Sequence, residues 1–139
     1  MNPLTWLLVL SAAALFGGML MFSLVVAPRV HQRLPRETAS ELLHGLFPWY
    51  YGYCGALALV LAATAWWTDA LWVFVFSLPV LAGFAFAGAY LLPALNRAQE
   101  YRDEDPLAAD RFTRLHRTSM LINLAQMILL AIILVRVVR

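Results

Sequence analysis

Four long stretches of the chain contain no Asp, Glu, Lys or Arg, and they define its hydrophobic pattern. These stretches are Met1–Pro28, Leu42–Thr68, Ala70–Asn96 and Thr118–Val135. A helix needs roughly 20 apolar residues to cross the hydrocarbon core, and a charge at its centre costs about 2.5–3.5 kcal/mol on insertion scales. The pattern therefore predicts four transmembrane helices. Their expected spans are about residues 4–28, 46–67, 70–93 and 118–137.

Capping signals predict that the helices are longer than the membrane is thick. Asn2-Pro3 and Asp105-Pro106 each join a capping side chain to a proline suited to the first helical turn. The segment Thr38–Glu41 has the spacing of a capping box, so we expect the second helix to start there. The third helix can continue as far as Asp103. The expected fold class is all-α, a single domain over residues 1–139: an up-down four-helix membrane bundle whose third and fourth helices extend into the cytoplasm.

Arginine is unequally distributed between the two sides of the predicted bundle. Eight of the ten basic residues follow the first and third stretches, whereas only Arg136 and Arg139 fall on the other side. Positively charged loops stay cytoplasmic, so both termini are expected outside. Four tryptophans then lie at the outer interface, where amphipathic rings are enriched: Trp6, Trp66, Trp67 and Trp72.

Composition agrees with a lipid environment. The chain is 63% apolar and 13% charged, with a mean hydropathy of +0.74, against about 45–50% and about 25% in soluble domains. A soluble enzyme, a secreted disulfide scaffold and a disordered tail are thereby excluded. Cys54 is the only cysteine and cannot form an intramolecular disulfide. The net charge is +2, but the sequence shows no basic face with interleaved aromatic residues of the kind that binds nucleic acid. The expected partner is therefore the lipid bilayer and not nucleic acid.

A polar stripe begins the fourth predicted helix. His116, Ser119, Asn123 and Gln126 fall within about 80° of one another at 100° per residue, and the other faces are apolar. Together with Tyr50, the nearest expected partner, they form what we term the polar seam. Polar groups on a membrane helix point inward or toward water. The seam is either a site for a small ligand or a set of interhelical hydrogen bonds worth about 0.6 kcal/mol each.

Other candidate chemistry is sparse. His31, His44 and His116 all lie toward the cytoplasmic half, and Glu41 precedes His44 at the spacing of a di-iron motif, but the further ligands that such a bundle needs are missing. Solvated interfacial histidines are therefore expected, with no metal and no cofactor. The aromatic segment Leu46–Tyr51 could line a pocket or form an interfacial belt. No arrangement of catalytic residues is visible, which favours a non-enzymatic protein.

Three pairs of small residues have the spacing that allows close helix packing in lipid. They are Ala14/Gly18, Gly52/Ala56 and Gly83/Ala87. Four helices cannot use all of this surface internally, so a homo-oligomer is expected.

Three ordered elements together resemble the transmembrane protein 205-like family. They are Leu34-Pro35-Arg36-x-Thr38, Leu46-Phe47-Pro48-Trp49-Tyr50 and Phe112-x-Arg114-x-His116-x-x-Ser119-x-x-x-Asn123. The resemblance covers nearly the whole chain. It implies a four-span bundle, with bacterial members of unknown function, and it relates the chain to eukaryotic proteins associated with tolerance of platinum drugs. Together with the arginine distribution, the expected location is a bacterial inner (cytoplasmic) membrane with both termini periplasmic. The residues carried over are Pro35, Arg36, Phe47, Pro48, Tyr50, His116, Ser119 and Asn123.

The expected function is that of a non-enzymatic multi-pass membrane protein whose polar seam binds a small ligand or a partner helix. A fainter likeness to copper-resistance membrane proteins and to protoporphyrinogen oxidase, around Gly17-Gly18 and Ala27-Pro28-Arg29, supports the alternative of a haem- or metal-dependent redox protein. A structural subunit of a larger membrane complex is the third possibility.

Overall fold

The computed structural model describes all 139 residues and is entirely helical. Its elements are α1 (Pro3–Met21), the π-helical turn η1 (Phe22–Val26), α2 (Ala27–Arg33), α3 (Arg36–Trp67), α4 (Leu71–Phe86), the π-helical turn η2 (Ala87–Leu91), α5 (Leu92–Glu100) and α6 (Pro106–Val138). The π-helical turns join their neighbours without a break. The result is four continuous helices, each long and apolar enough to cross a membrane.

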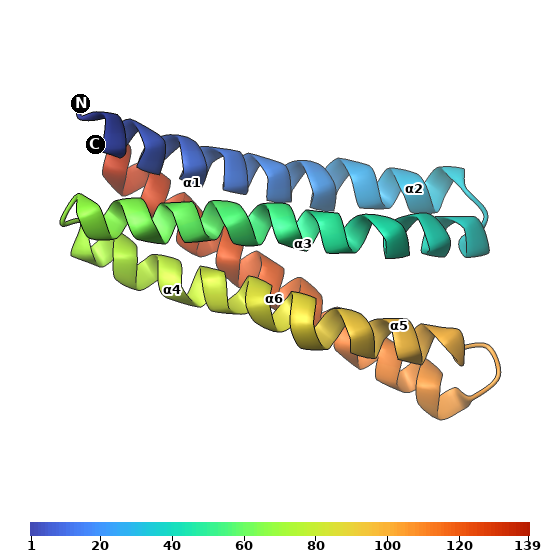
Figure 1. The fold of residues 1–139 in the computed structure, drawn as a ribbon. Helices are drawn as coiled ribbons and strands as arrows, with labels where there is room; N and C mark the ends of the chain where they lie inside the picture. Colours follow the sequence, from blue (N-terminus) through green and yellow to red (C-terminus); the bar gives the residue numbers. More distant parts are fainter.

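The four helices lie side by side along one long axis (Figure 1). Helix α3 packs against α1 and α4, and α6 packs against α1, α4 and α5. Both termini lie at one end of the molecule, together with the α3–α4 connection, and the α2–α3 and α5–α6 connections lie at the other (Figure 1). Every arginine-rich segment is therefore at the end opposite the termini.

Two of the predicted helix caps are confirmed. The Asn2 side chain accepts a hydrogen bond from the Leu4 N–H at 2.9 Å, and Asp105 accepts one from the Leu107 N–H at 3.0 Å. Each bond satisfies a donor that the first helical turn leaves without a partner. The caps fix where α1 and α6 begin.

The capping box predicted at Thr38–Glu41 is wrong, because α3 already begins at Arg36. A residue before proline is pushed out of helical conformation, and Leu34, which precedes Pro35, is extended with φ −114° and ψ 149°. The chain therefore turns at this dipeptide and resumes helical geometry at once. The third helix also ends earlier than expected, at Glu100 rather than Asp103.

The two π-helical turns each precede a proline. Proline has no N–H to donate, so the carbonyl four residues earlier lacks its α-helical partner. In η1 the Ala27 N–H reaches back five residues to the Phe22 carbonyl before Pro28, and in η2 Leu92 does the same to Ala87 before Pro93. Such turns insert one additional residue into a helix, and they redirect the side chains that follow.

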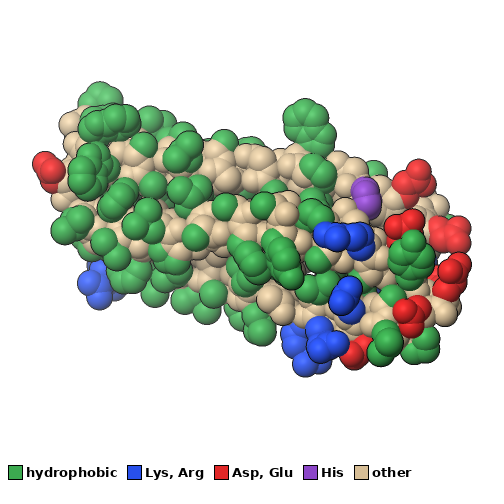
Figure 2. Space-filling model, turned by 60° about the horizontal axis from the view of Figure 1, so that its bottom comes forward, with side chains coloured by type: hydrophobic (Ala, Val, Ile, Leu, Met, Phe, Trp, Pro, Cys, Tyr) green, Lys and Arg blue, Asp and Glu red, His purple; other side chains and the backbone are tan.

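The hydrophobic core occupies the half of the bundle nearer the termini. Its thirteen buried residues are Leu8, Ala12, Leu15, Met19, Cys54, Ala58, Leu61, Ala65, Val73, Val80, Phe84, Leu130 and Ile133. Many large apolar side chains remain exposed on the outside, as expected of a surface that meets lipid. Charged side chains gather mainly at the end opposite the termini (Figure 2).

The three pairs of small residues differ in whether they make close contacts between helices. Gly83 and Ala87 pack inside, and Gly18 approaches Tyr53 so closely that an added Cβ would lie 3.1 Å from the ring. In contrast, Gly52 and Ala56 are exposed, and no atom would lie within 4 Å of a Cβ added to Gly52. That pair therefore makes no close helix contact within one chain.

Candidate functional site

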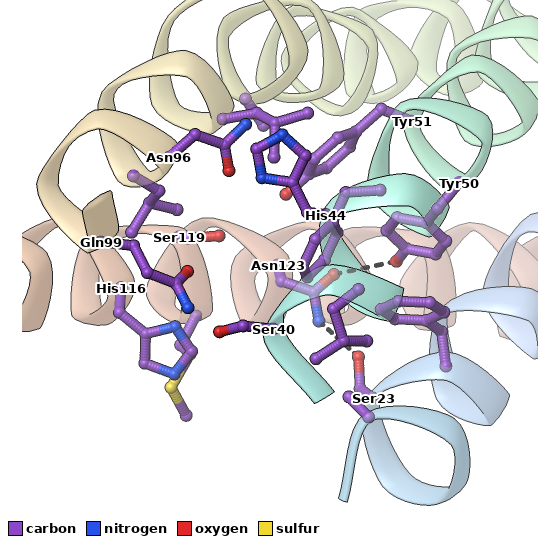
Figure 3. A pocket seen from close by; sticks show the side chains of 18 of the residues that line it. Ser23, Ser40, His44, Tyr50, Tyr51, Asn96, Gln99, His116, Ser119 and Asn123 are labelled. Carbon is purple, nitrogen blue, oxygen red and sulfur yellow. Dashed lines mark hydrogen bonds between the residues drawn. The ribbon is translucent and has the colours of Figure 1, made fainter. Parts of the chain in front are cut away.

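A cavity of about 670 Å³ occupies the half of the bundle that lacks the core. One side of it is formed by η1, α2 and α3, and the other by η2, α5 and α6 (Figures 1 and 3). All five members of the polar seam line it: Tyr50, His116, Ser119, Asn123 and Gln126. The sequence predicted that these side chains face inward, and the fold brings them to one cavity together with Ser23, Ser40, Asn96 and Gln99.

Asn123 joins three helices at the inner end of this cavity. Its Oδ1 accepts a hydrogen bond from the Tyr50 hydroxyl at 3.4 Å, and its Nδ2 donates to Ser23 Oγ at 3.0 Å (Figure 3). Nδ2 also lies 3.4 Å from Met127 Sδ on its own helix. The expected contact with Tyr50 is therefore present, and Ser23 is a partner that the sequence did not indicate. The position of Ser23 within η1 explains how it reaches α6.

Gln126 has a different role in the seam. Its side chain is buried, and Nε2 donates a hydrogen bond of 2.8 Å to the Val80 carbonyl on α4. Gly83 leaves the space that this amide occupies, since a Cβ there would overlap with it. The Gln126 side chain thus serves mainly to hydrogen-bond α6 to α4. This is the structural role that the sequence analysis left open for the polar seam.

Aromatic rings form one wall of the cavity. Phe22 stacks on Tyr50 with ring centroids 4.3 Å apart, and Phe47 lies 5.4 Å from Phe22 and 5.8 Å from Tyr51. The aromatic segment of α3 therefore splits between two surroundings. Its inward rings line the cavity, whereas Trp49 is 82% exposed on the outside.

A second stack lies at the mouth of the cavity. The guanidinium carbon of Arg102 lies 4.5 Å from the centroid of the Phe112 ring, which in turn stacks on His116 at 5.9 Å. His116 precedes the uncharged stretch of α6. Partial burial lowers the pKa of its imidazole, and the neighbouring His31 and Arg102 act in the same direction. The ring is therefore mainly neutral at pH 7 and can donate one hydrogen bond and accept another.

The three histidines share the cavity but form no metal site. His31, His44 and His116 all line it, and all three are also exposed, as the sequence analysis expected of interfacial histidines. No group of three or more His, Cys, Asp or Glu side chains is close enough to hold a metal ion.

Sequence reasoning missed the contribution of α5 and the turn after it. Asn96, Gln99 and Arg102 line the cavity and recur every three residues, a helical spacing that could have indicated a polar face. The residues were read only as part of an exposed extension. Their role depends on α5 packing beside α6 (Figure 1).

Most of the residues that carry the family resemblance also lie around the cavity. Six of the eight line the cavity: Arg36, Phe47, Tyr50, His116, Ser119 and Asn123. The other two are prolines with structural positions. Pro35 precedes the first residue of α3, and Pro48 lies exposed within that helix.

Comparison with known proteins gives one match. The family model described as Domain of unknown function (DUF4149) matches residues 10–104, more than half of the chain. No curated protein and no solved structure matches. The matched region contains the aromatic wall and ends before the polar residues of α6.

Proposed function

The chain belongs to the DUF4149 family, whose function is unknown, and we propose that it is a non-enzymatic multi-pass membrane protein that binds a small ligand between its helices. The ligand site is the polar seam around His116, Ser119 and Asn123. One observation carries the proposal: the seam, an aromatic wall and the mouth stack all border one cavity of about 670 Å³. Sites for small molecules are usually concave, mostly apolar and supplied with a few convergent polar groups.

The finer family assignment to transmembrane protein 205-like proteins is part of this proposal. Its support is the clustering of six of the eight resembling residues around the cavity. Residues shared for packing alone would be expected in the core at the opposite end of the bundle.

The proposed setting is an up-down bundle in a bacterial inner membrane, with both termini periplasmic and the α5–α6 hairpin extending into the cytoplasm. The unequal distribution of arginine supports this orientation. The exposed Trp6, Trp66 and Trp67 near the opposite end fit an outer interface. We also propose association with a second copy, supported by the unused Gly52/Ala56 surface.

The ligand proposal is tested by filling the cavity. Ser119→Phe places a ring inside it, whereas Thr118→Phe adds the same ring at a neighbouring exposed position that does not line it. Native mass spectrometry of protein purified in mild detergent then detects small molecules that remain bound. The wild type and Thr118→Phe should retain them, and Ser119→Phe should lose them.

Circular dichroism and thermal unfolding show whether each variant is folded. Equal retention by folded Ser119→Phe and wild type would contradict a ligand in this cavity. Retention of a second protein instead of a small molecule would assign the cavity to a partner helix.

The redox alternative has a narrower basis, namely the presence of three histidines around one cavity. A haem held between helices would use facing histidines as axial ligands. A Soret band that disappears in His116→Gln would support this alternative over a non-enzymatic ligand site.

A further inference from the structure

The cavity lies between two helical hairpins that diverge toward the end opposite the termini (Figure 1). In one hairpin α2 packs against α3, and in the other α5 packs against α6. Met120 on α6 lines the cavity, belongs to the uncharged stretch of that helix and is 59% exposed. The cavity therefore reaches the surface that faces lipid, and an apolar chain can extend from it into the hydrocarbon region.

The charged side chains that line this cavity are basic. They are Arg36 and Arg102, and no carboxylate lines it. Burial lowers the pKa of the His116 imidazole, and the neighbouring His31 and Arg102 lower it further. The electrostatic potential beside His116 is therefore positive.

The two arginines differ in whether their charge is already compensated. Arg36 forms an exposed ion pair with Asp103, in which Nη2 and Oδ1 are 3.3 Å apart. Arg102 is partly buried and forms no ion pair, and its guanidinium carbon lies 4.5 Å from the centroid of the Phe112 ring. A guanidinium that stacks on a ring keeps the N–H groups at its edge available to an oxyanion. Arg102 is therefore the cation of the cavity that a ligand can use.

The outer groove beside the cavity carries both signs of charge. Three arginines line it together with four carboxylates, and Arg97 is the arginine that lines the groove but not the cavity. These mixed charges favour neither an anion nor a cation. The charge selectivity of the site therefore depends on the cavity and not on the groove.

We propose that the cavity binds an amphiphile that carries an oxyanion head group, a carboxylate or a phosphate, on an apolar chain. The head-group oxygens accept hydrogen bonds from the Arg102 guanidinium and from the imidazole of His116. The apolar chain lies against the wall formed by Phe22 and Phe47, with Met120 on the side open to lipid. This proposal rests on the proposed ligand site and specifies the ligand class.

A negatively charged amphiphile fits these groups better than a cationic or an uncharged one. Arginine forms strong charge-assisted hydrogen bonds to carboxylate and phosphate oxygens. A cation of the same shape would be repelled by Arg102, and the cavity offers it no carboxylate. An uncharged head group would leave the partly buried guanidinium without a counter-charge. The negative charge is therefore what the cavity should select.

The test compares ligands that differ only in the charge of the head group. Native mass spectrometry measures the binding of myristate, tetradecan-1-ol and tetradecyltrimethylammonium to the full chain in an uncharged detergent. Myristate should bind about tenfold more tightly than the alcohol, the change expected of a hydrogen bond to a charged group. Tetradecyltrimethylammonium should bind more weakly than the alcohol.

Competition experiments distinguish the sources of the oxyanion. Displacement of myristate by an equal concentration of dioctanoyl phosphatidic acid would assign the cavity to a phospholipid head group, and persistence of myristate would assign it to a free fatty acid. Either result supports the proposal. Inorganic phosphate lacks the apolar chain and should displace neither ligand. Displacement by inorganic phosphate would overturn the proposal that the ligand is an amphiphile.

Three variants test the role assigned to Arg102. Arg102→Gln removes the charge and should abolish the preference for myristate over the alcohol. Arg102→Lys keeps the charge and should retain most of the preference, which separates the charge from the stack on Phe112. Arg97→Gln removes an arginine that lines only the groove and should leave the preference unchanged. Circular dichroism shows whether each variant is folded.

Equal binding of myristate and tetradecan-1-ol by the wild type, or an unchanged preference in folded Arg102→Gln, would overturn this proposal. If Ser119→Phe abolishes binding of both ligands but the wild type shows no preference, only this inference fails. If folded Ser119→Phe binds myristate as the wild type does, the proposed ligand site itself fails.

Discussion

Asn123 on α6 donates a hydrogen bond of 3.0 Å to Ser23, a residue 100 positions earlier in the chain. Ser23 lies in the π-helical turn η1, and the same Asn123 accepts from Tyr50 on α3. One amide thus connects three of the four long helices beyond the hydrophobic core. This connection lies in the lining of the cavity, so the packing of the bundle and the proposed ligand site meet at one residue.

The first prediction concerns Asn123→Leu. Leucine is apolar and fits the interior of a membrane helix bundle, so the fold should persist. Tyr50 and Ser23, however, lose the side chain to which both are hydrogen-bonded. We expect a loss of about 1 kcal/mol in the free energy of unfolding together with loss of ligand retention. Thermal unfolding and native mass spectrometry measure the two effects.

The matched control for that change is Asn96→Leu. Asn96 also lines the cavity but makes no side-chain hydrogen bond, so the stability should not fall. If Asn123→Leu loses stability but retains the ligand as the wild type does, Asn123 has only a structural role.

The second prediction concerns Gly83→Ala. The added Cβ would overlap with the Gln126 amide and lie 3.3 Å from Ile122 Cγ2. Overpacking of this kind typically costs about 1–3 kcal/mol. Unfolding in detergent should show the loss, and Gln126→Ala in the same chain should recover part of it by removing the overlapping group.

Gly52→Ala provides the comparison, because its Cβ would meet nothing within 4 Å. Its unfolding free energy should stay the same or rise by up to about 1 kcal/mol from helix propensity. Equal destabilisation by both alanines would contradict overlap with the Gln126 amide as the cause of the loss.

The third prediction concerns orientation. A reporter that is active only in the periplasm should be active when fused after Arg139, and one that is active only in the cytoplasm should be active when inserted after Asp103. Both results follow from the eight arginines at one end of the bundle. A cytoplasmic C-terminus would reverse the assignment of both ends.

The fourth prediction concerns association of two copies. Gly52→Ile adds bulk to the exposed small-residue surface of α3 and should reduce dimers cross-linked in native membranes. Ala85→Ile adds bulk to an exposed position on α4 and should not. Dimers that persist unchanged in Gly52→Ile would place any interface elsewhere.

The four apolar helices and two of their caps could be predicted because their causes are local. A charge-free stretch of about 20 residues, or an Asn or Asp before a proline, needs no knowledge of the rest of the chain. The inward direction of the polar seam was also predictable, since lipid offers its groups no partners.

The arrangement of residues at the mouth of the cavity could not be predicted from the sequence. Arg102 contacts Phe112 across the α5–α6 connection, and only the packing of these two helices brings them together. The start of α3 was mispredicted for a different reason. Two local signals competed there, and the backbone restriction before Pro35 outweighed the capping spacing at Thr38–Glu41.

The π-helical turn η1 also sets the rotational register of the first long helix. In an uninterrupted α-helix at 100° per residue, His31 would point about 120° away from the face of Met19, twelve residues before it. The additional residue in η1 absorbs about 100° of that rotation. One continuous helix can thereby direct Met19 into the core and His31 to the cavity on the same side. Deleting one residue within Phe22–Val26 would remove the additional residue and restore regular helix, and Met19 and His31 would still face the same side.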